Sequence, residues 1–160
     1  MAMTPEQGEA LRQLLQRQDI AALGTLHRGE PFVSMVPYAL LDDGRLVIHV
    51  SQLATHTKDM QEHAGVSVMV LGTRAPGALP QEQPRASLQG EAQPCMVDAA
   101  DYAAARQAYL ARFPDSEPMF GFGDFSLFLI TARSVRFVAG FAQAWSMTGA
   151  DYAVLMRAPS

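Results

Sequence analysis

Three strand-like segments joined by very short turns constrain the fold of this chain more than any other feature. The first two, residues 20–27 and 31–41, are separated by an Arg-Gly-Glu turn, and Asp42-Asp43-Gly44 leads into the third, residues 45–50. The second segment alternates between two sets of side chains, as a strand with two distinct faces does. Because tight turns join antiparallel neighbours, the sequence predicts a meander of three consecutive strands.

Further strand-like segments indicate a mainly β fold. They cover residues 66–71, 85–96, 125–131 and 134–147, with Gly90 marking a bulge or a close backbone approach and Gly140 a bend. Six to seven strands with few helices favour an antiparallel sheet closed into a small barrel, its ends covered by flanking helices. An open sandwich is the alternative. No linker is long enough to separate domains, so we expect residues 1–160 to form one domain.

The expected helices are recognised by their capping residues. One begins at Pro5, where Thr4 and Gln7 can form a capping box, and ends near residue 18. A second covers residues 51–63, and a third covers residues 99–112 with Asp98 as its cap. Residues 151–156 are expected to add a last helical turn.

Composition excludes several classes of protein. The net charge is −4 and there is no basic tract, which argues against a nucleic-acid partner. No apolar run reaches the roughly 20 residues of a membrane span, and the first residues lack the features of a secretion signal. A single cysteine, Cys95, fits a reducing compartment, so we expect a cytoplasmic protein. The four histidines have no metal-ligand spacing, and we expect no metal site.

The segment from Ser51 to Lys58 carries the most informative chemistry. It lies where a strand passes into a helix, and it combines hydroxyls with His56 and a lysine. A helix N-terminus offers free amide groups and a positive dipole end, which suit a phosphate group. The alternative is that Thr55 or Thr57 simply caps the helix and Lys58 is a solvated surface residue.

Two other residues have both a functional and a structural interpretation. Pro37 interrupts strand pairing, so it marks either an edge strand or a place where a flat ligand uses the freed backbone groups. Trp145 either stacks on a ligand ring or fills the core.

Taken together, these segments resemble the FMN-binding split barrel, the family of pyridoxamine 5′-phosphate oxidase. The resemblance rests on Ala22-Leu23-Gly24-Thr25-Leu26, on residues 31–38, and on Ser51-Gln52-Leu53-Ala54-Thr55-His56-Thr57-Lys58-Asp59-Met60. The spacing of the last segment, with residues 124–128 and 140–145, is similar to the haem-utilisation branch of the family. The resemblance covers most of the chain in the same order, and it implies a split β-barrel that binds FMN.

The resemblance also implies roles for particular residues. The strand that includes Val36, Pro37 and Tyr38 would lie along the isoalloxazine ring and offer it backbone hydrogen bonds. The phosphate group would be held by Ser51, His56, Thr57 and Lys58. Two residues, Arg85 and Trp145, would reach the flavin from the partner subunit of a homodimer.

The chain also departs from its family in ways that bear on function. The arginine–histidine signature of the oxidase is missing, and His56-Thr57 replaces the Arg-Lys pair of its phosphate site. No histidine follows His63, whereas haem-degrading relatives use one from a C-terminal tail, and Ala142 stands where the branch has a glycine. The sequence therefore predicts neither pyridoxamine 5′-phosphate oxidation nor haem degradation through a tail histidine. It leaves a flavin-dependent oxidoreductase of unknown substrate, with a haem-handling or other small-ligand binding protein as the alternative.

Overall fold

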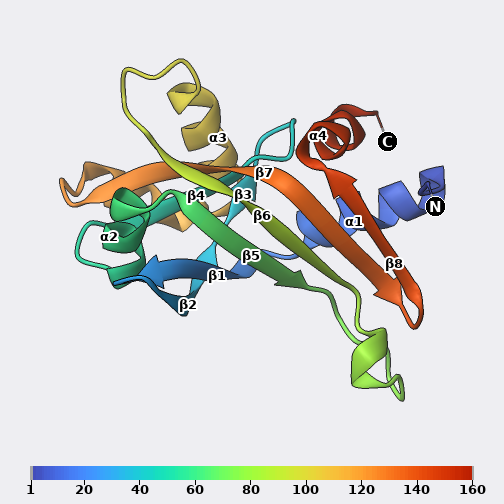
Figure 1. Ribbon diagram of the computed structural model, residues 1–160. Helices are drawn as coiled ribbons and strands as arrows, with labels where there is room; N and C mark the ends of the chain where they lie inside the picture. Colours follow the sequence, from blue (N-terminus) through green and yellow to red (C-terminus); the bar gives the residue numbers. More distant parts are fainter. Residues whose placement is uncertain (1, 160) are drawn as a thin grey trace.

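An antiparallel sheet of eight strands with flanking helices forms the fold of residues 2–159, which the computed structural model describes (Figure 1). The strands are β1 (Ile20–His27), β2 (Glu30–Pro37), β3 (Ala39–Leu40), β4 (Leu46–Ser51), β5 (Gly65–Leu71), β6 (Arg85–Cys95), β7 (Phe125–Gly140) and β8 (Gln143–Thr148). The helices are α1 (Pro5–Arg17), α2 (Thr55–Glu62), α3 (Tyr102–Arg112) and α4 (Gly149–Arg157), with 3₁₀ turns at Pro80–Glu82 and Pro114–Gly121. The predicted mainly β class is confirmed.

The order of strands across the sheet is β2-β1-β5-β6-β7-β4-β3, and β8 also pairs with β7. The two ends of this order meet where β2 contacts β4, but no ladder joins these strands within the described chain. The sheet is therefore a barrel that stays split along one seam, as the resemblance implied.

The predicted three-stranded meander is wrong. Strand β2 pairs with β1, and β3 pairs with β4 at the opposite end of the strand order. The expected single strand over residues 31–41 breaks at Tyr38, whose amide donates to the Asp19 carbonyl at 3.0 Å and whose hydroxyl donates to the Leu15 carbonyl at 2.6 Å. This buried anchor turns the chain from one edge of the sheet to the other.

Two smaller expectations also need correction. The segments 125–131 and 134–147 are not separate strands: β7 runs without a break to Gly140, which ends the strand at a hairpin into β8. Asp98 does not cap α3; the helix follows Asp101, whose carboxylate instead binds Arg45 at 2.9 Å.

Features predicted from a few adjacent residues agree with the structure. Thr4 and Gln7 form the predicted capping box, with the Thr4 amide donating to Gln7 Oε1 at 2.8 Å and the Gln7 amide donating to Thr4 Oγ1 at 3.3 Å. The β6–β7 register shifts between Gln89 and Gly90, as expected of a bulge. A Cβ atom on Gly90 would lie 1.9 Å from the Thr131 carbonyl oxygen. Glycine is required there because the two backbones touch.

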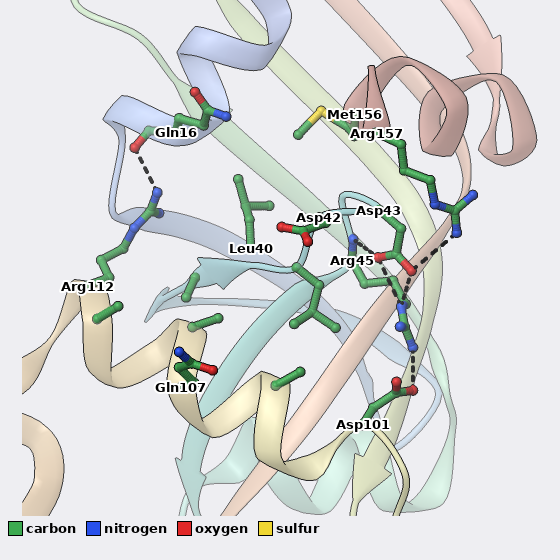
Figure 2. Close-up of a pocket in the computed structure, with 15 residues that line it drawn as sticks. Gln16, Leu40, Asp42, Asp43, Arg45, Asp101, Gln107, Arg112, Met156 and Arg157 are labelled. Carbon is green, nitrogen blue, oxygen red and sulfur yellow. Dashed lines mark hydrogen bonds and ion pairs between the residues drawn. The ribbon is translucent and has the colours of Figure 1, made fainter. Parts of the chain in front are cut away.

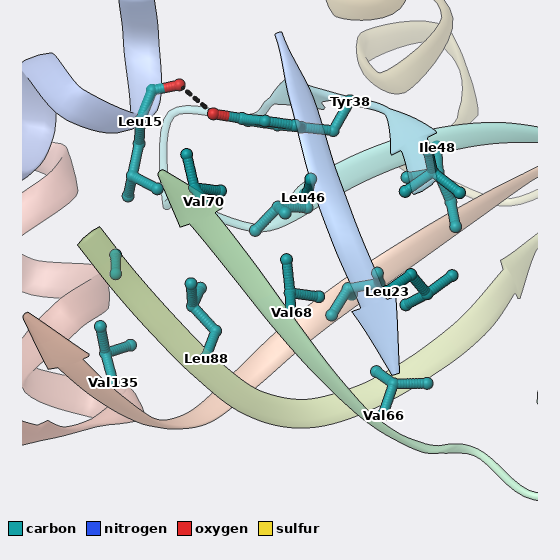
Figure 3. Close-up of a cluster of buried hydrophobic side chains, with 14 of the residues drawn as sticks. Leu15, Leu23, Tyr38, Leu46, Ile48, Val66, Val68, Val70, Leu88 and Val135 are labelled. Carbon is teal, nitrogen blue, oxygen red and sulfur yellow. Dashed lines mark hydrogen bonds between the residues drawn. The ribbon is translucent and has the colours of Figure 1, made fainter. Parts of the chain in front are cut away.

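Two layers of buried side chains hold the elements together. The main core lies inside the curved sheet and is closed by α1 and Tyr38; Figure 3 shows Leu23, Ile48, Val68 and Leu88 converging there. A second, smaller cluster packs α3 against the other face of β4 and β7. None of the helices in the described residues combines the length and the apolar character needed to cross a membrane.

Replacing Gly90 with alanine should destabilise the protein by about 2–4 kcal/mol, because the new methyl group must push β6 away from β7. Urea denaturation followed by circular dichroism measures this loss. Gly121→Ala is the matched control, since a Cβ atom at Gly121 meets nothing within 4 Å. Equal stability of the two variants would contradict the close approach.

Candidate functional site

The start of helix α2 is open to an anion. Its N-cap residue is Ala54, whose methyl side chain makes no capping hydrogen bond. The amides of Thr57 and Lys58 donate to the Ala54 carbonyl at 3.2 and 3.3 Å, but within residues 2–159 the amides of Thr55 and His56 have no such partner. Unsatisfied amides at the positive end of a helix dipole form the geometry that binds phosphate groups.

The side chains around this helix start divide into exposed and buried groups. Thr55 and Lys58 are exposed, and Lys58 forms no ion pair in the described part of the chain. Thr57 is fully buried, and its hydroxyl donates to the Ser51 carbonyl at 2.6 Å. Thr57 therefore shapes the turn, and Thr55 is the hydroxyl that faces solvent. The two threonines face different sides of the helix, so Thr55, and not the expected Thr57, presents its hydroxyl to a ligand in solvent.

Ser51 remains beside the open helix start but is partly engaged. Its hydroxyl accepts from the Leu53 amide at 3.1 Å and donates to Asp124 Oδ2 at 3.4 Å. The contact to Asp124 is long, so this hydroxyl keeps some freedom to turn toward a ligand.

His56 lies half-buried between α2 and β2. Its Nδ1 is 3.3 Å from the Ser34 hydroxyl oxygen. Burial lowers the pKa of His56, and the nearby carboxylate of Asp59 opposes that shift. The lowered pKa favours the neutral imidazole, and a nearby negative charge shifts the balance toward the protonated ring.

A buried carboxylate, which the sequence did not single out, supports this helix. Asp59 is 3% exposed, and it accepts from the Thr25 hydroxyl at 2.8 Å and from His27 Nδ1 at 2.7 Å. Burial raises the pKa of Asp59, but the hydrogen bonds from His27 and Thr25 and the charges of His27 and His56 outweigh it, so the pKa lies below its ordinary value. In the sequence, Asp59 could have been recognised as a charged residue on the inner face of a short helix.

The β2 residues predicted to contact a ring differ in what they can offer. Val36 is buried, and Pro37 ends a strand that lies at the edge of the sheet, in agreement with the edge-strand interpretation. Tyr38 offers nothing free: its carbonyl accepts from Arg112 at 3.0 Å, and its amide and hydroxyl are used in the core. An edge strand still presents unpaired backbone groups to a ligand.

Arg85 and Trp145 lie away from α2 in the same chain. Arg85 pairs with Val138 at one end of β7, whereas Ser51 pairs with Phe125 at the other. The Arg85 guanidinium donates to the carbonyls of Gln81 and Gln83, and the Trp145 ring stacks on Phe137 at 6.0 Å between centroids. One chain does not bring these two residues to the helix start.

The outer face of the sheet carries a continuous trough. Two hollows of about 550 Å³ each share Gly24, Val33, Ser67 and Gln89 in their walls. Small residues such as Gly24 and Ser67 lie in its floor together with larger apolar side chains such as Phe32 and Met69, and Arg133 and Arg136 lie along it. Val33 and Met35 of β2 are 68% and 61% exposed on this side of the molecule.

A further hollow, of about 1200 Å³, lies between the β3–β4 hairpin, α3 and the end of α4 (Figure 2). Its charges are largely neutralised: Asp43 contacts Arg45 at 2.8 Å and Arg157 at 3.6 Å, and Arg45 also reaches Asp101. Arg112 donates to the Gln16 carbonyl at 2.7 Å and so closes one side. This hollow therefore offers less to a charged ligand than α2 does.

Other reactive side chains are structural. His49 stacks on Phe120 with 3.9 Å between ring centroids, and burial lowers its pKa to about 4. Cys95 is buried. The described residues hold no group of three or more side chains that could bind a metal ion together.

Comparison with known proteins places these features in context. A protein-family model described as Pyridoxamine 5′-phosphate oxidase matches residues 8–139. The chain is 34% identical over 146 residues to a chloroplastic protein of Arabidopsis thaliana named non-canonical heme oxygenase HOZ, covering 88% of this chain and 43% of that one.

Solved structures give the same fold. A heme binding protein from Mycobacterium smegmatis has a TM-score of 0.84 and 28% identity, over 96% of this chain and 62% of that one. Campylobacter jejuni ChuZ has a TM-score of 0.77 over 92% of this chain and 61% of that one, and its 18% identity supports the fold alone. The chain thus spans less than half of the Arabidopsis protein and about three-fifths of these two structures.

Proposed function

The chain belongs to the pyridoxamine 5′-phosphate oxidase family, and we propose that it binds FMN and acts as a flavin-dependent oxidoreductase. The observation that carries this proposal is the open start of α2. There, two amides that have no hydrogen-bond partner among residues 2–159 lie beside Thr55 and Lys58, and Lys58 is the only lysine of the chain. A phosphate monoester needs such a combination of amide donors and a cation.

The edge of the sheet beside α2 offers a place for the isoalloxazine ring of FMN. The edge strand β2 would offer backbone groups near Val36 and Pro37 to the isoalloxazine ring, with Ser51 and His56 near the phosphate. FMN supplies the redox chemistry when bound, and the protein binds and orients it. Of the residues expected to hold the cofactor, Thr57 and Tyr38 would contribute through packing, since their hydroxyl groups already donate to backbone carbonyls.

Haem handling is the second candidate function. Two relatives favour it by name, the Arabidopsis heme oxygenase and the mycobacterial heme binding protein. The exposed apolar side chains of Val33 and Met35 would suit a flat macrocycle. Within the given sequence, the histidines that could ligate a haem iron are His27, His49, His56 and His63.

The absorption spectrum of the purified full-length protein separates the two functions. Flavin bands, retained on dialysis and released on denaturation, support the proposal. A Soret band that develops on addition of haem, in protein that binds no FMN, would replace the proposal with the second candidate.

Lys58→Ala should weaken FMN binding by about 1–3 kcal/mol, because the phosphate loses its one permanent side-chain cation at the helix start. A titration of flavin fluorescence measures the change in affinity. Arg74→Ala is the matched control, since it removes the same charge from an exposed loop. Unchanged affinity in Lys58→Ala would refute the role of Lys58.

We also propose a two-fold homodimer that covers the outer trough and brings Arg85 and Trp145 of one subunit to the helix start of the other. Light scattering at micromolar concentration should give twice the chain mass of 17.4 kDa. Val33→Asp should shift the protein toward monomer by burying a charge in the interface. Val154→Asp, on the exposed face of α4, should not. A monomer that binds FMN tightly would overturn the shared site.

A further inference from the structure

The first turn of α2 carries one titratable side chain and one fixed cation beside its open amides. His56 is half-buried there, and Thr57 is buried. Lys58 then remains as the only side chain of fixed positive charge in the first turn of the helix. Two negative charges on a phosphate group would face one fixed cation and one titratable group.

Several charged and polar groups surround His56. Ser34 of β2 is 3.3 Å from its Nδ1, and Lys58 and Asp59 belong to the same helix. Ser51, which precedes the helix in the sequence, lies next to the carboxylate of Asp124. Behind Asp59 stand Thr25 and His27 of β1, which contact both of its carboxylate oxygens.

The carboxylate of Asp59 cannot turn away from this position. It is buried, its Oδ2 accepts from Thr25, and its Oδ1 accepts from His27. Because an ionised carboxylate only accepts hydrogen bonds, His27 Nδ1 is the donor in this contact. The negative charge is therefore fixed one helical turn behind the open amides. Because His56 and Asp59 are three residues apart in α2, their side chains are neighbours on the helix, and the carboxylate can stabilise a cation on His56.

We propose that Asp59 is a positioning residue of this site: held by Thr25 and His27, it stabilises the imidazolium form of His56, so that the helix binds a phosphate group together with one proton. This inference rests on the proposed function, because it concerns the same phosphate site. In the imidazolium form both ring nitrogens donate, one toward Ser34 and the other toward the ligand.

The proposal fixes the sign of the pH dependence. In the free protein, burial lowers the pKa of His56 and keeps the ring neutral near neutral pH. A bound phosphate favours the charged ring, so a proton is taken up on binding and affinity rises as pH falls. The dissociation constant should decrease by up to about tenfold per pH unit, the limit set by uptake of one proton.

Calorimetric titration of FMN into the full chain tests this directly. A phosphate monoester has a second pKa of about 6, so measurements between about pH 7 and pH 8.5 keep the ligand a dianion. Two buffers with different ionisation enthalpies report the protons taken up. Close to one proton is expected with FMN and none with riboflavin, which lacks the phosphate group.

Three variants separate positioning from folding. His56→Arg should bind FMN without proton uptake, and at the upper end of this pH range more tightly than the natural protein. Asp59→Asn keeps the shape and should reduce both proton uptake and affinity. Thr25→Val, which removes one of the two hydrogen bonds to Asp59, should reduce proton uptake and affinity by a smaller amount. If Asp59→Asn fails to fold, Thr25→Val still tests the role of Asp59, and the comparison of His56→Arg with His56→Gln tests the titration of His56.

Two kinds of failure remain distinct. FMN binding that takes up no proton, or that keeps its pH dependence in His56→Arg, would overturn this inference and leave the proposed function standing. Failure of the natural protein to bind FMN at every pH would overturn the proposed function itself.

Discussion

The pairing of β7 with three other strands holds the sheet together. Its first half pairs with β4, its second half pairs with β8, and β6 follows it on the other side throughout. The exchange of partners occurs near Thr131 and Ala132. At this point a Cβ atom on Gly90 would lie 1.9 Å from one carbonyl oxygen, and a Cβ atom on Gly149 would lie 2.0 Å from the next. Backbone contact at two glycines therefore allows one strand to serve both halves of the barrel.

The sequence predicted what depends on neighbours along the chain. The capping box of α1, the bounds of β1 and the bulge at Gly90 all follow from a few adjacent residues. Pairing between distant strands could not be predicted in this way. The alternation of residues 31–41 continues through Tyr38, and only the core contacts of that side chain, with Leu15 and with Arg112 from α3, show why the strand ends there.

In the candidate site, too, adjacent residues could be interpreted from the sequence, whereas contacts between distant residues could not. A helix start rich in hydroxyls is visible in the sequence, but helical rotation decides that Thr55 is exposed and Thr57 is buried. The contacts of Asp59 reach Thr25 and His27, more than thirty residues earlier in the chain. Arg85 and Trp145 depend on the arrangement of the whole sheet, and their place relative to the helix start follows only from the strand order.

The alanine before α2 has a consequence for any attempt to improve this protein. A serine or an aspartate at residue 54 would cap the helix and raise its stability by about 1 kcal/mol. The same oxygen would compete with the proposed ligand for the helix amides, and an aspartate would also repel a phosphate group. Selection for a higher melting temperature alone would therefore favour a more stable fold that has lost the proposed phosphate site, as expected where a function depends on hydrogen bonds left unmade in the free protein.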